Sequence, residues 1–345
     1  MRNAQKLLVG ALAAGFTLAA VPTYAAEVDG PEVNWRISVW GNPRAFTAGG
    51  EYLAQKVKEK TDGKFNITIG YGEQFSKDRE NLDSVKMGAV EGAYFCNFYH
   101  PGKNPAFMVF SLPFLPLGDW DVNVEARKKL FAHPALQKDM DMWDAFVYAG
   151  ALMPQYEFMG VGEPPHKLED WEGKRVRAGG GLGDAMVKLG ARKTTTTATE
   201  VYTSMDRGTM DAASFPYTYS HAAYRLPEVS KWFTSNMAPG TSACPLVFSK
   251  TAFNKLPPQY QQLTKDLLDE VYEVQAKAYQ EIDKKNLPEF REQLIEVKYS
   301  PEQLEEFRKI AAKPVWDEWI EANKKRFDGQ ELIDVILETA KAQGK

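Results

Sequence analysis

The chain has 345 residues, of which 44% are hydrophobic and 26% charged, and its formal net charge is −4. Its lysines and arginines are scattered through a mildly acidic sequence, which argues against binding to nucleic acid, because that function needs a dense basic surface. The length exceeds what one hydrophobic core usually holds, so we expect two lobes.

The first 26 residues have the pattern of a secretory signal peptide. Arg2 and Lys6 form a basic start, residues 7–20 are apolar but too few to span a membrane, and small residues follow. We expect residues 1–26 to be removed and the mature chain to be periplasmic, without a lipid anchor. Without Arg2 and Lys6, 40 basic and 46 acidic residues remain, a net charge of −6.

Strand and helix patterns alternate along the first half of the mature chain. Phe65, Ile67 and Ile69 share one face of an expected strand. Alternation of this kind is typical of an α/β sheet. The expected elements are strands at 35–40, 64–69 and 90–97 and helices at 46–61 and 78–87.

Two short patterns of the first half recur in the second. Gly63-Lys64 and the strand after it have an echo 110 residues later, at Gly173-Lys174. The segment KMGAVEGA at 86–93 has an echo 120 residues later, DRGTMDAA at 206–213. Both echoes come in the same order, so they indicate two lobes of related architecture.

The longest helical pattern starts at Pro257 or Pro258 and reaches about Asn286. At about 1.5 Å per residue it is about 40 Å long, which is more than one lobe needs, so we expect it to span both. Pro288 should kink or end this helix. Further helices are expected at 301–323, kinked or broken by Pro314, and at 331–342.

Cys96 and Cys244 are the only cysteines in the chain. In an oxidising compartment they could form one disulfide, or they could be two separate buried thiols. The sequence does not give the distance between them, so both alternatives stay open.

The glycine run at 179–181 does not match a nucleotide-binding loop. A P-loop needs lysine and a hydroxyl residue after its last glycine, but Asp184 follows Gly183 and also occupies the third glycine position of a Rossmann pattern. The four histidines are not spaced as metal ligands, and no GxSxG motif occurs. We therefore expect no cofactor, metal or catalytic residue, and a secreted enzyme is the alternative from a different class.

Arg177 is the most informative charged residue. By the first echo, Arg175 and Arg177 occupy the face that Phe65 and Ile67 use for packing, and arginine is seldom buried without an anionic partner. One interpretation is an exposed edge strand with solvated charges. The other places Arg177 at the carboxyl end of a strand, where α/β sheets bind ligands, with its guanidinium holding a carboxylate through two parallel hydrogen bonds.

Aromatic residues gather at similar strand ends, where they can be core residues or ligand contacts. In the first half these are Trp40, Phe95, Phe98 and Tyr99, and in the second Tyr156, Phe158, Phe215, Tyr217 and Tyr219.

These features together resemble the periplasmic solute-binding subunits of tripartite ATP-independent periplasmic (TRAP) transporters, of the C4-dicarboxylate-binding type. The resemblance covers essentially the whole mature chain. It implies a periplasmic binding protein-like α/β fold, with a ligand cleft between two lobes, and delivery of the solute to a membrane permease. Its segments, in order, are 73–95 (EQFSKDRENLDSVKMGAVEGAYF), 111–115 (SLPFL), 168–180 (LEDWEGKRVRAGG) and 199–216 (TEVYTSMDRGTMDAASFP).

The resemblance implies that Arg177 grips a substrate carboxylate. Many relatives carry a second arginine 20 positions earlier, where this chain has Glu157, and often a third at the position of Tyr99. An asparagine position of the family is Phe215 here. Because two positive groups are missing and one is reversed in sign, these departures argue against a dicarboxylate.

Two ligand classes remain open. In the favoured one, Arg177 binds a carboxylate, aromatic residues enclose the ligand, and Glu157 accepts from a hydroxyl or amine. In the other, Glu157 holds a small amine or zwitterion such as ethanolamine inside an aromatic box. The expected ligand-binding residues are Arg177, Glu157, Phe215, Tyr99, Asn97, Trp40, Asn42, Tyr156, Tyr217 and Asn236.

We expect the lobes to exchange segments of the chain. Residues 27–152 with about 240–287 should form lobe I, and residues 153–239 with about 288–345 should form lobe II. We also expect a monomer.

Overall fold

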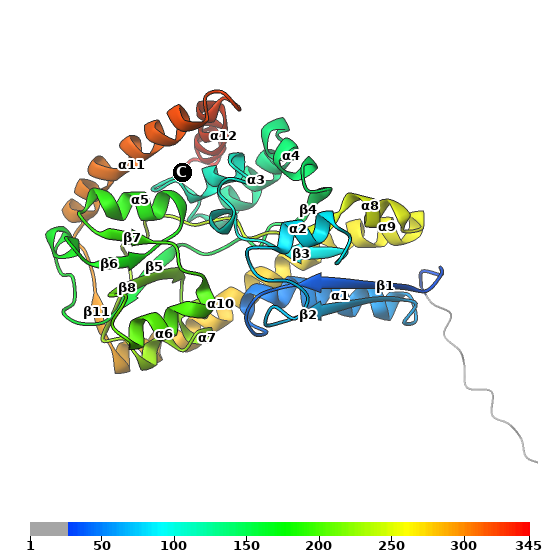
Figure 1. Cartoon of the computed structure of the whole chain (residues 1–345), viewed down its shortest axis with the longest axis horizontal. Coiled ribbons are helices and arrows are strands. Elements are labelled where there is room, and N and C mark those ends of the chain that lie inside the picture. The colour runs from blue at the N-terminus through cyan, green and yellow to red at the C-terminus, as the bar shows by residue number, and fades with distance from the viewer. Residues whose placement is uncertain (1–26) are drawn as a thin grey trace, which may run out of the picture.

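The computed structural model describes residues 27–345, so the predicted signal peptide at 1–26 lies outside the described residues. Two β-sheets, each covered by helices, form two lobes that lie side by side (Figure 1). The α/β two-lobe fold expected from the sequence is confirmed.

Sheet A forms the centre of lobe I, with its strands in the order β2-β1-β3-β10-β4. β1 runs parallel to β2 and β3, whereas β10 runs antiparallel to β3 and β4. Of the residues predicted to share one face of β2, Phe65 is buried, and Ile67 and Ile69 are half-buried because β2 lies at the edge of the sheet. The strands are β1 (Val33–Ser38), β2 (Phe65–Gly70), β3 (Gly92–Tyr94), β4 (Ala145–Ala149) and β10 (Leu246–Ser249).

Sheet B forms the centre of lobe II, with its strands in the order β11-β9-β5-β8-β6-β7. β6 is parallel to both β7 and β8, and β5 is antiparallel to β8 and β9. The strands are β5 (Tyr156–Gly160), β6 (Arg175–Arg177), β7 (Arg192–Thr194), β8 (Ala212–Pro216), β9 (Trp232–Thr234) and β11 (Ile295–Val297).

The two sheets share a parallel trio, in which β7-β6-β8 repeats the order of β2-β1-β3. β3 and β8 come from the two segments of the 120-residue echo, so that echo reflects equivalent strands. The 110-residue echo does not, because it compares the edge strand β2 with β6, whose counterpart in the sheet order is β1. Arg177 therefore does not correspond to a residue of β2.

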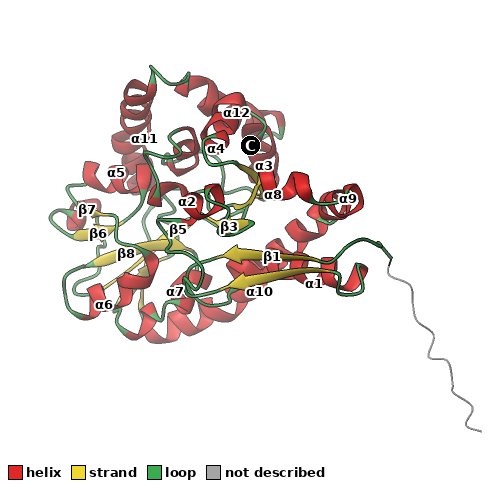
Figure 2. Cartoon of the chain, turned by 45° about the vertical axis from the view of Figure 1, so that its right-hand side comes forward, coloured by secondary structure: helices red, strands yellow, loops and turns green. Residues whose placement is uncertain are grey.

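Twelve α-helices surround the sheets within residues 27–345, and a long one lies beneath both lobes (Figure 2). They are α1 (Ala48–Lys60), α2 (Asn81–Lys86), α3 (Trp120–Phe131), α4 (Pro134–Asp141), α5 (Gly180–Lys188), α6 (Val201–Asp206), α7 (Tyr219–Ala223), α8 (Lys250–Lys255), α9 (Pro258–Asp266), α10 (Leu268–Gln293), α11 (Pro301–Asn323) and α12 (Gly329–Ala342). Short 3-10 helices are η1 (Ala45–Thr47), η2 (Asn97–Tyr99), η3 (Ala106–Ser111), η4 (Leu168–Trp171), η5 (Ala198–Glu200) and η6 (Leu226–Glu228).

The long helical pattern is divided at Leu267 into α9 and α10. α10 has 26 residues and is about 39 Å long, and it contacts α1 in lobe I and α7 in lobe II. Pro288 does not end α10, which continues to Gln293, and α11 continues past Pro314. A proline removes one backbone hydrogen bond, and in both helices the remaining bonds carry the helix through.

The chain crosses from sheet A to sheet B between β4 and β5 and returns between β9 and β10. We propose that the lobe boundaries lie in these two segments. α12 packs against α3, and its Leu332, Ile333 and Ile336 belong to a core shared with lobe I. We therefore propose to place α12 in lobe I, although the sequence put it in lobe II. None of the helices in 27–345 combines the length and apolar character that a membrane span requires.

Candidate ligand-binding pocket

A narrow pocket lies between the lobes, at the ends of β1, β3, β6 and β8. About 280 Å³ of space lies between its atoms, but it has room for only about one water molecule, so an organic ligand could enter only when the lobes part. Its walls are formed by Trp40, Arg44, Phe46, Cys96, Phe98, Tyr99, Met153, Tyr156, Arg177, Ala198, Phe215, Pro216, Tyr219, Ser220, Tyr224 and Cys244.

Arg177 is the last residue of β6, paired in register with Ala213 of β8, and it is 1% exposed. Its Nε donates to the Thr196 carbonyl at 3.0 Å and its Nη1 to the Ser214 carbonyl at 2.7 Å. These bonds to the segments that follow β7 and form β8 fix the guanidinium in place. No carboxylate of residues 27–345 lies within 4.0 Å of it. A buried positive charge without a negative partner favours an anionic ligand.

Two aromatic rings flank the Arg177 guanidinium. Its central carbon lies 4.4 Å from the ring centroid of Phe215 and 5.3 Å from that of Phe98. The flat faces of the rings attract the cation and limit its movement. Arginine has five N–H groups, and the contacts above leave one on Nη1 and one or two on Nη2 for a ligand.

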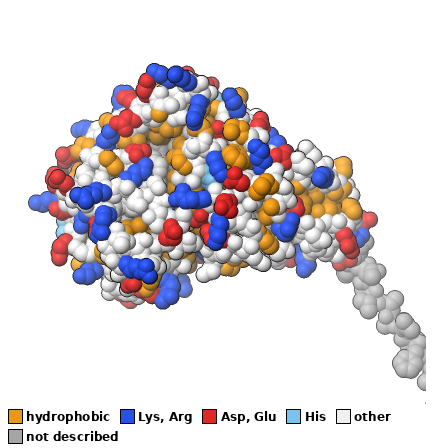
Figure 3. Space-filling view, in the orientation of Figure 1, with side chains coloured by type: hydrophobic (Ala, Val, Ile, Leu, Met, Phe, Trp, Pro, Cys, Tyr) orange, Lys and Arg blue, Asp and Glu red, His pale blue; other side chains and the backbone are white. Residues whose placement is uncertain are grey.

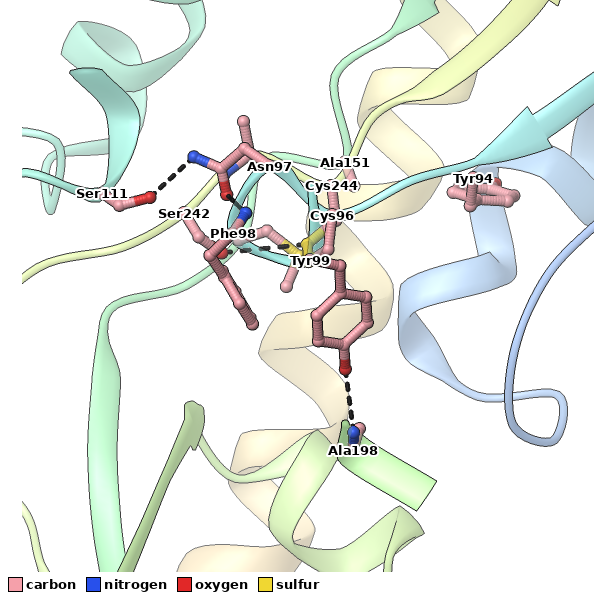
Figure 4. Close-up of a disulfide and its surroundings, with 12 residues drawn as sticks. Tyr94, Cys96, Asn97, Phe98, Tyr99, Ser111, Ala151, Ala198, Ser242 and Cys244 are labelled. Atoms are coloured by element: carbon pink, nitrogen blue, oxygen red, sulfur yellow. Dashed lines mark hydrogen bonds between the residues drawn. A yellow bond between two sulfur atoms is a disulfide. The ribbon is translucent and has the colours of Figure 1, made fainter. Parts of the chain in front are cut away.

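Tyr99 joins the two lobes at the pocket (Figure 4). Its hydroxyl accepts a 2.8 Å hydrogen bond from the backbone N–H of Ala198 in lobe II, and Nη2 of Arg177 lies 3.4 Å away. Burial raises the pKa of Tyr99, so the hydroxyl stays protonated. Tyr99 therefore has a polar contact with lobe II at the position where relatives often carry arginine.

Cys96 and Cys244 form a disulfide in the pocket wall (Figure 4). The antiparallel pairing of β3 with β10 brings the two cysteines together from 148 residues apart. Of the two alternatives that the sequence left open, the structure has the disulfide.

Glu157 does not line the pocket, although it was expected to contact the ligand. It follows Tyr156 on β5, and successive side chains of a strand point to opposite faces, so Tyr156 reaches the pocket and Glu157 does not. Its carboxylate accepts from Met237 N–H at 3.2 Å, from Ala238 N–H at 3.0 Å and from the Thr234 hydroxyl. Burial raises the pKa of Glu157 to about 7.

The structure brings five of the ten expected ligand-binding residues to the pocket, namely Trp40, Tyr99, Tyr156, Arg177 and Phe215. Besides Glu157, four others have different surroundings. Asn97 bonds the Phe107 carbonyl and the Ser111 hydroxyl, and Asn236 pairs with the backbone of Tyr299. Asn42 is exposed, and Tyr217 lies outside the pocket walls.

Sequence reasoning missed Arg44, Phe46 and Tyr224 as pocket residues. Tyr219 was noted as an aromatic residue at a strand end but was not included among the expected ligand contacts. Arg44 and Phe46 follow the end of β1, and Tyr224 follows α7. The strand-end rule that selected Trp40 could have selected Arg44, which is four residues further on. Tyr224 carries no such signal, since only the packing of α7 brings it to the pocket.

The glycines at 179–181 allow lobe I to approach the start of α5. A side chain at Gly179 would collide with the ring of Phe98, and one at Gly181 would lie 2.7 Å from the Ser111 carbonyl. Gly180 has φ +54°, in the left-handed region that favours glycine. The run therefore serves close packing at the edge of the pocket.

Charges of both signs are mixed over the face of the molecule seen in Figure 3. Within 27–345, no group of three or more histidine, cysteine or acidic side chains is arranged to hold a metal ion. The charged residues of the pocket wall are two arginines, Arg44 and Arg177, which lie among aromatic rings.

Comparison with known proteins gives similar chains among curated proteins and among solved structures. A monocarboxylate 2-oxoacid-binding periplasmic protein of Nostoc sp. is 27% identical over 254 residues, which are 70% of this chain and 67% of that protein. A TRAP periplasmic solute binding protein of Desulfovibrio salexigens with bound orotic acid has a TM-score of 0.79 at 22% identity, over 89% of this chain and 98% of that one.

A TRAP solute binding protein of Rhodoferax ferrireducens, in complex with copurified benzoate, has a TM-score of 0.78 at 16% identity, over 90% of this chain and 99% of that one. The family model of bacterial extracellular solute-binding proteins, family 7, matches residues 39–323. This match covers every strand except β1 and every residue of the pocket wall, so the chain belongs to family 7 of the bacterial extracellular solute-binding proteins.

Proposed function

We propose that this protein is a periplasmic receptor that captures a compact organic carboxylate and delivers it to the permease of a TRAP transporter. The observation that carries the proposal is the buried guanidinium of Arg177, which faces the pocket and has no carboxylate partner within residues 27–345. A ligand carboxylate would supply the missing negative charge through charge-assisted hydrogen bonds.

The composition of the pocket wall favours an acid over an amine. Two arginines and no aspartate or glutamate stand among the wall residues. An ammonium ligand would therefore meet positive charge without a counter-ion. The amine alternative depended on Glu157, whose carboxylate is bound by the backbone of Met237 and Ala238 on the other face of β5. For this reason we do not propose Glu157 as a ligand contact.

The aromatic wall suits a ligand with a flat or apolar body. Rings of Trp40, Phe98 and Phe215 stand beside the cations and can pack against such a body while excluding water. The three similar proteins described above are named for, or hold, small carboxylic acids. Their ligands guide the choice of compounds to test.

Capture and release require the lobes to close and open. The two crossing segments and α10 connect the lobes, and Tyr99 contacts Ala198 across the pocket. In our proposal a hinge motion about the crossings opens this contact, and a bound carboxylate favours the closed state. The receptor works as a monomer and uses neither a cofactor nor a metal.

The test is a binding screen of the mature protein. The compound retained after purification would be identified by mass spectrometry, and thermal shifts would be recorded with benzoate, orotate, pyruvate, succinate and ethanolamine. One or more acids should raise Tm in a concentration-dependent way, because a ligand that binds only the folded state stabilises it. Stabilisation by ethanolamine and by no acid would refute the carboxylate proposal.

The same samples distinguish a receptor from an enzyme. An acid that binds should be recovered unchanged after prolonged incubation with the protein. Chemical conversion of the bound acid would contradict the receptor proposal.

A further inference from the structure

Arg44 is a second cation in the pocket, and its contacts leave half of its guanidinium unused. Its Nη1 donates to the carbonyls of Trp40 at 2.9 Å and Asn42 at 2.7 Å. Its Nε is buried and has no hydrogen-bond partner among residues 27–345. Nη2 makes no hydrogen bond within those residues either.

The unused atoms are the ones that bind a carboxylate side-on. Nε–H and one Nη2–H of an arginine point in parallel, and together they match the two oxygens of a carboxylate. The two bonds of Nη1 hold the guanidinium in a fixed position, so less conformational entropy is lost when a ligand binds.

Aromatic rings also position this cation. The central carbon of Arg44 lies 4.8 Å from the ring centroid of Phe46, 5.7 Å from that of Tyr224 and 5.9 Å from that of Trp40. Tyr224 stacks on Phe215, and the ring of Phe215 in turn lies against the Arg177 guanidinium. The hydroxyl of Tyr224 is buried without a hydrogen-bond partner within residues 27–345.

The electrostatics of the pocket favour a ligand with acceptors for both cations. No carboxylate within residues 27–345 lies within 4.0 Å of either guanidinium. Arg177 is buried and Arg44 half-buried, and two positive charges in the wall of one narrow pocket repel each other. An acceptor placed near each one offsets that repulsion.

We infer that Arg44 is a ligand-binding residue, and that the preferred solute is a compact carboxylic acid with a second oxygen acceptor, bound by Arg177 at one end and Arg44 at the other. This inference rests on the proposed function and adds the substrate class to it. It also changes the expectation from the sequence, which counted two of the family's usual positive groups as missing. Arg44 supplies a second positive group from a different position in the chain.

The test uses three ligands that share one ring and differ only at position 3: benzoate, 3-hydroxybenzoate and isophthalate. Affinities would be measured by calorimetry for the wild-type protein and for Arg44→Ala. The wild type should bind 3-hydroxybenzoate, isophthalate or both at least about 10-fold more tightly than benzoate, since a hydrogen bond to a charged group contributes that much. Arg44→Ala should remove this advantage and change the affinity for benzoate less than about 3-fold.

Two further variants separate recognition from structure. Arg44→Lys keeps the charge but loses the pair of parallel donors, so it should retain only part of the advantage. Arg207→Ala removes one positive charge from an exposed position outside the pocket and should behave as the wild type. If Arg44 only shaped the loop after β1, Arg44→Ala would weaken all three ligands by the same factor, and that result would overturn the inference.

Other outcomes also decide the question. Equal wild-type affinities for the three ligands, or an advantage that survives in Arg44→Ala, would overturn the role of Arg44. If the wild type binds another acid of the screen but none of these three, the substrate class inferred here is wrong and the proposed function stands. If no acid of the screen binds, the proposed function itself fails.

Discussion

Each lobe contains an arginine and an acidic residue that bond to each other in the same way. The lobes differ two residues further along the strand that carries the arginine. In lobe I, Arg36 N–H donates to the Glu91 carboxylate at 2.7 Å and Glu91 N–H donates to the Arg36 carbonyl at 3.0 Å. In lobe II, Arg175 and Asp211 make the same two bonds at 2.7 and 2.9 Å. Glu91 and Asp211 are 120 residues apart, so the repeat belongs to the architecture.

The difference lies two residues further along each strand. Ser38 pairs in register with Ala93, and Arg177 pairs in the same way with Ala213. Ser38 is buried and donates to the Ser76 carbonyl at 3.4 Å, whereas Arg177 brings a charge into the pocket. Arg36 and Arg175, which make equivalent bonds in the two lobes, therefore serve the fold. Arg177 has no counterpart in lobe I, and it is the arginine that we assign to the ligand.

A second buried arginine shows that burial by itself does not mark an anion site. Arg127 of α3 is also 1% exposed, and no carboxylate in the described part of the chain pairs with it. It donates to the Asn123 side chain and to the Ser242 carbonyl, and it does not line the pocket. Burial lowers its pKa to about 10. Access to the pocket, together with burial, distinguishes Arg177.

The sharpest test replaces Arg177 of lobe II with serine, the residue that lobe I has at the equivalent position, Ser38. Arg177→Ser should reduce the affinity for the acid found in the screen by about 100-fold or more, because it removes both the charge and the paired donors. The folded state should persist, since the variant no longer buries an uncompensated charge. Calorimetry for affinity and circular dichroism for folding would check this.

The repeated arginines provide matched controls for that variant. Arg36→Ala and Arg175→Ala remove one arginine each from the equivalent positions, where the side chains are about half exposed, and should leave the affinity within about 3-fold of the wild type. An equal loss of affinity in Arg175→Ala and Arg177→Ser would contradict the division between an architectural and a ligand-binding arginine.

The disulfide is a feature of lobe I that has no counterpart in lobe II, where Pro216 stands 120 residues after Cys96. The double variant Cys96→Ala/Cys244→Ala should lower the free energy of unfolding by about 2–4 kcal/mol, because the disulfide restricts the unfolded chain. Denaturant unfolding would measure the loss, and reduction of the wild-type protein should reproduce it. Unchanged stability in both samples would show that the bridge contributes nothing to folding.

Glu157 should affect stability in a pH-dependent way without contacting the ligand. Its folded-state pKa of about 7 lies above the ordinary value of 4.5, so the folded protein binds the proton more tightly than the unfolded chain does. The resulting contribution to stability is fully present below about pH 4.5 and is lost as the pH rises to about 7. The wild type should therefore lose stability relative to Glu157→Gln between pH 5 and 8.

Thermal unfolding of both proteins across this range would measure the difference. Taking the difference removes the contributions of titrating groups that the two proteins share. Parallel curves would show that Glu157 has no raised pKa, and a large loss of affinity in Glu157→Gln at pH 7 would return Glu157 to the ligand site.

The sequence by itself determined the fold class, and it selected Arg177 as the cation that we propose for the ligand. Alternating apolar residues such as Phe65 and Ile67 predict a strand, and the 86–93 and 206–213 echo predicted a repeated strand, because local periodicity records which face of an element is buried. Arg177 could be selected because a basic residue at a strand end contradicts that periodicity.

Only the tertiary structure decided which residues share the pocket. The face on which Glu157 lies depends on the register of β5 against β8, and a shift by one residue exchanges the two faces of a strand. The pairing of Cys96 with Cys244 depends on the contact of β3 with β10, which are distant in sequence. Arg44 lies on a loop after β1, where no periodic pattern constrains a side chain, so its place in the same pocket wall as Arg177 follows from the meeting of the two lobes.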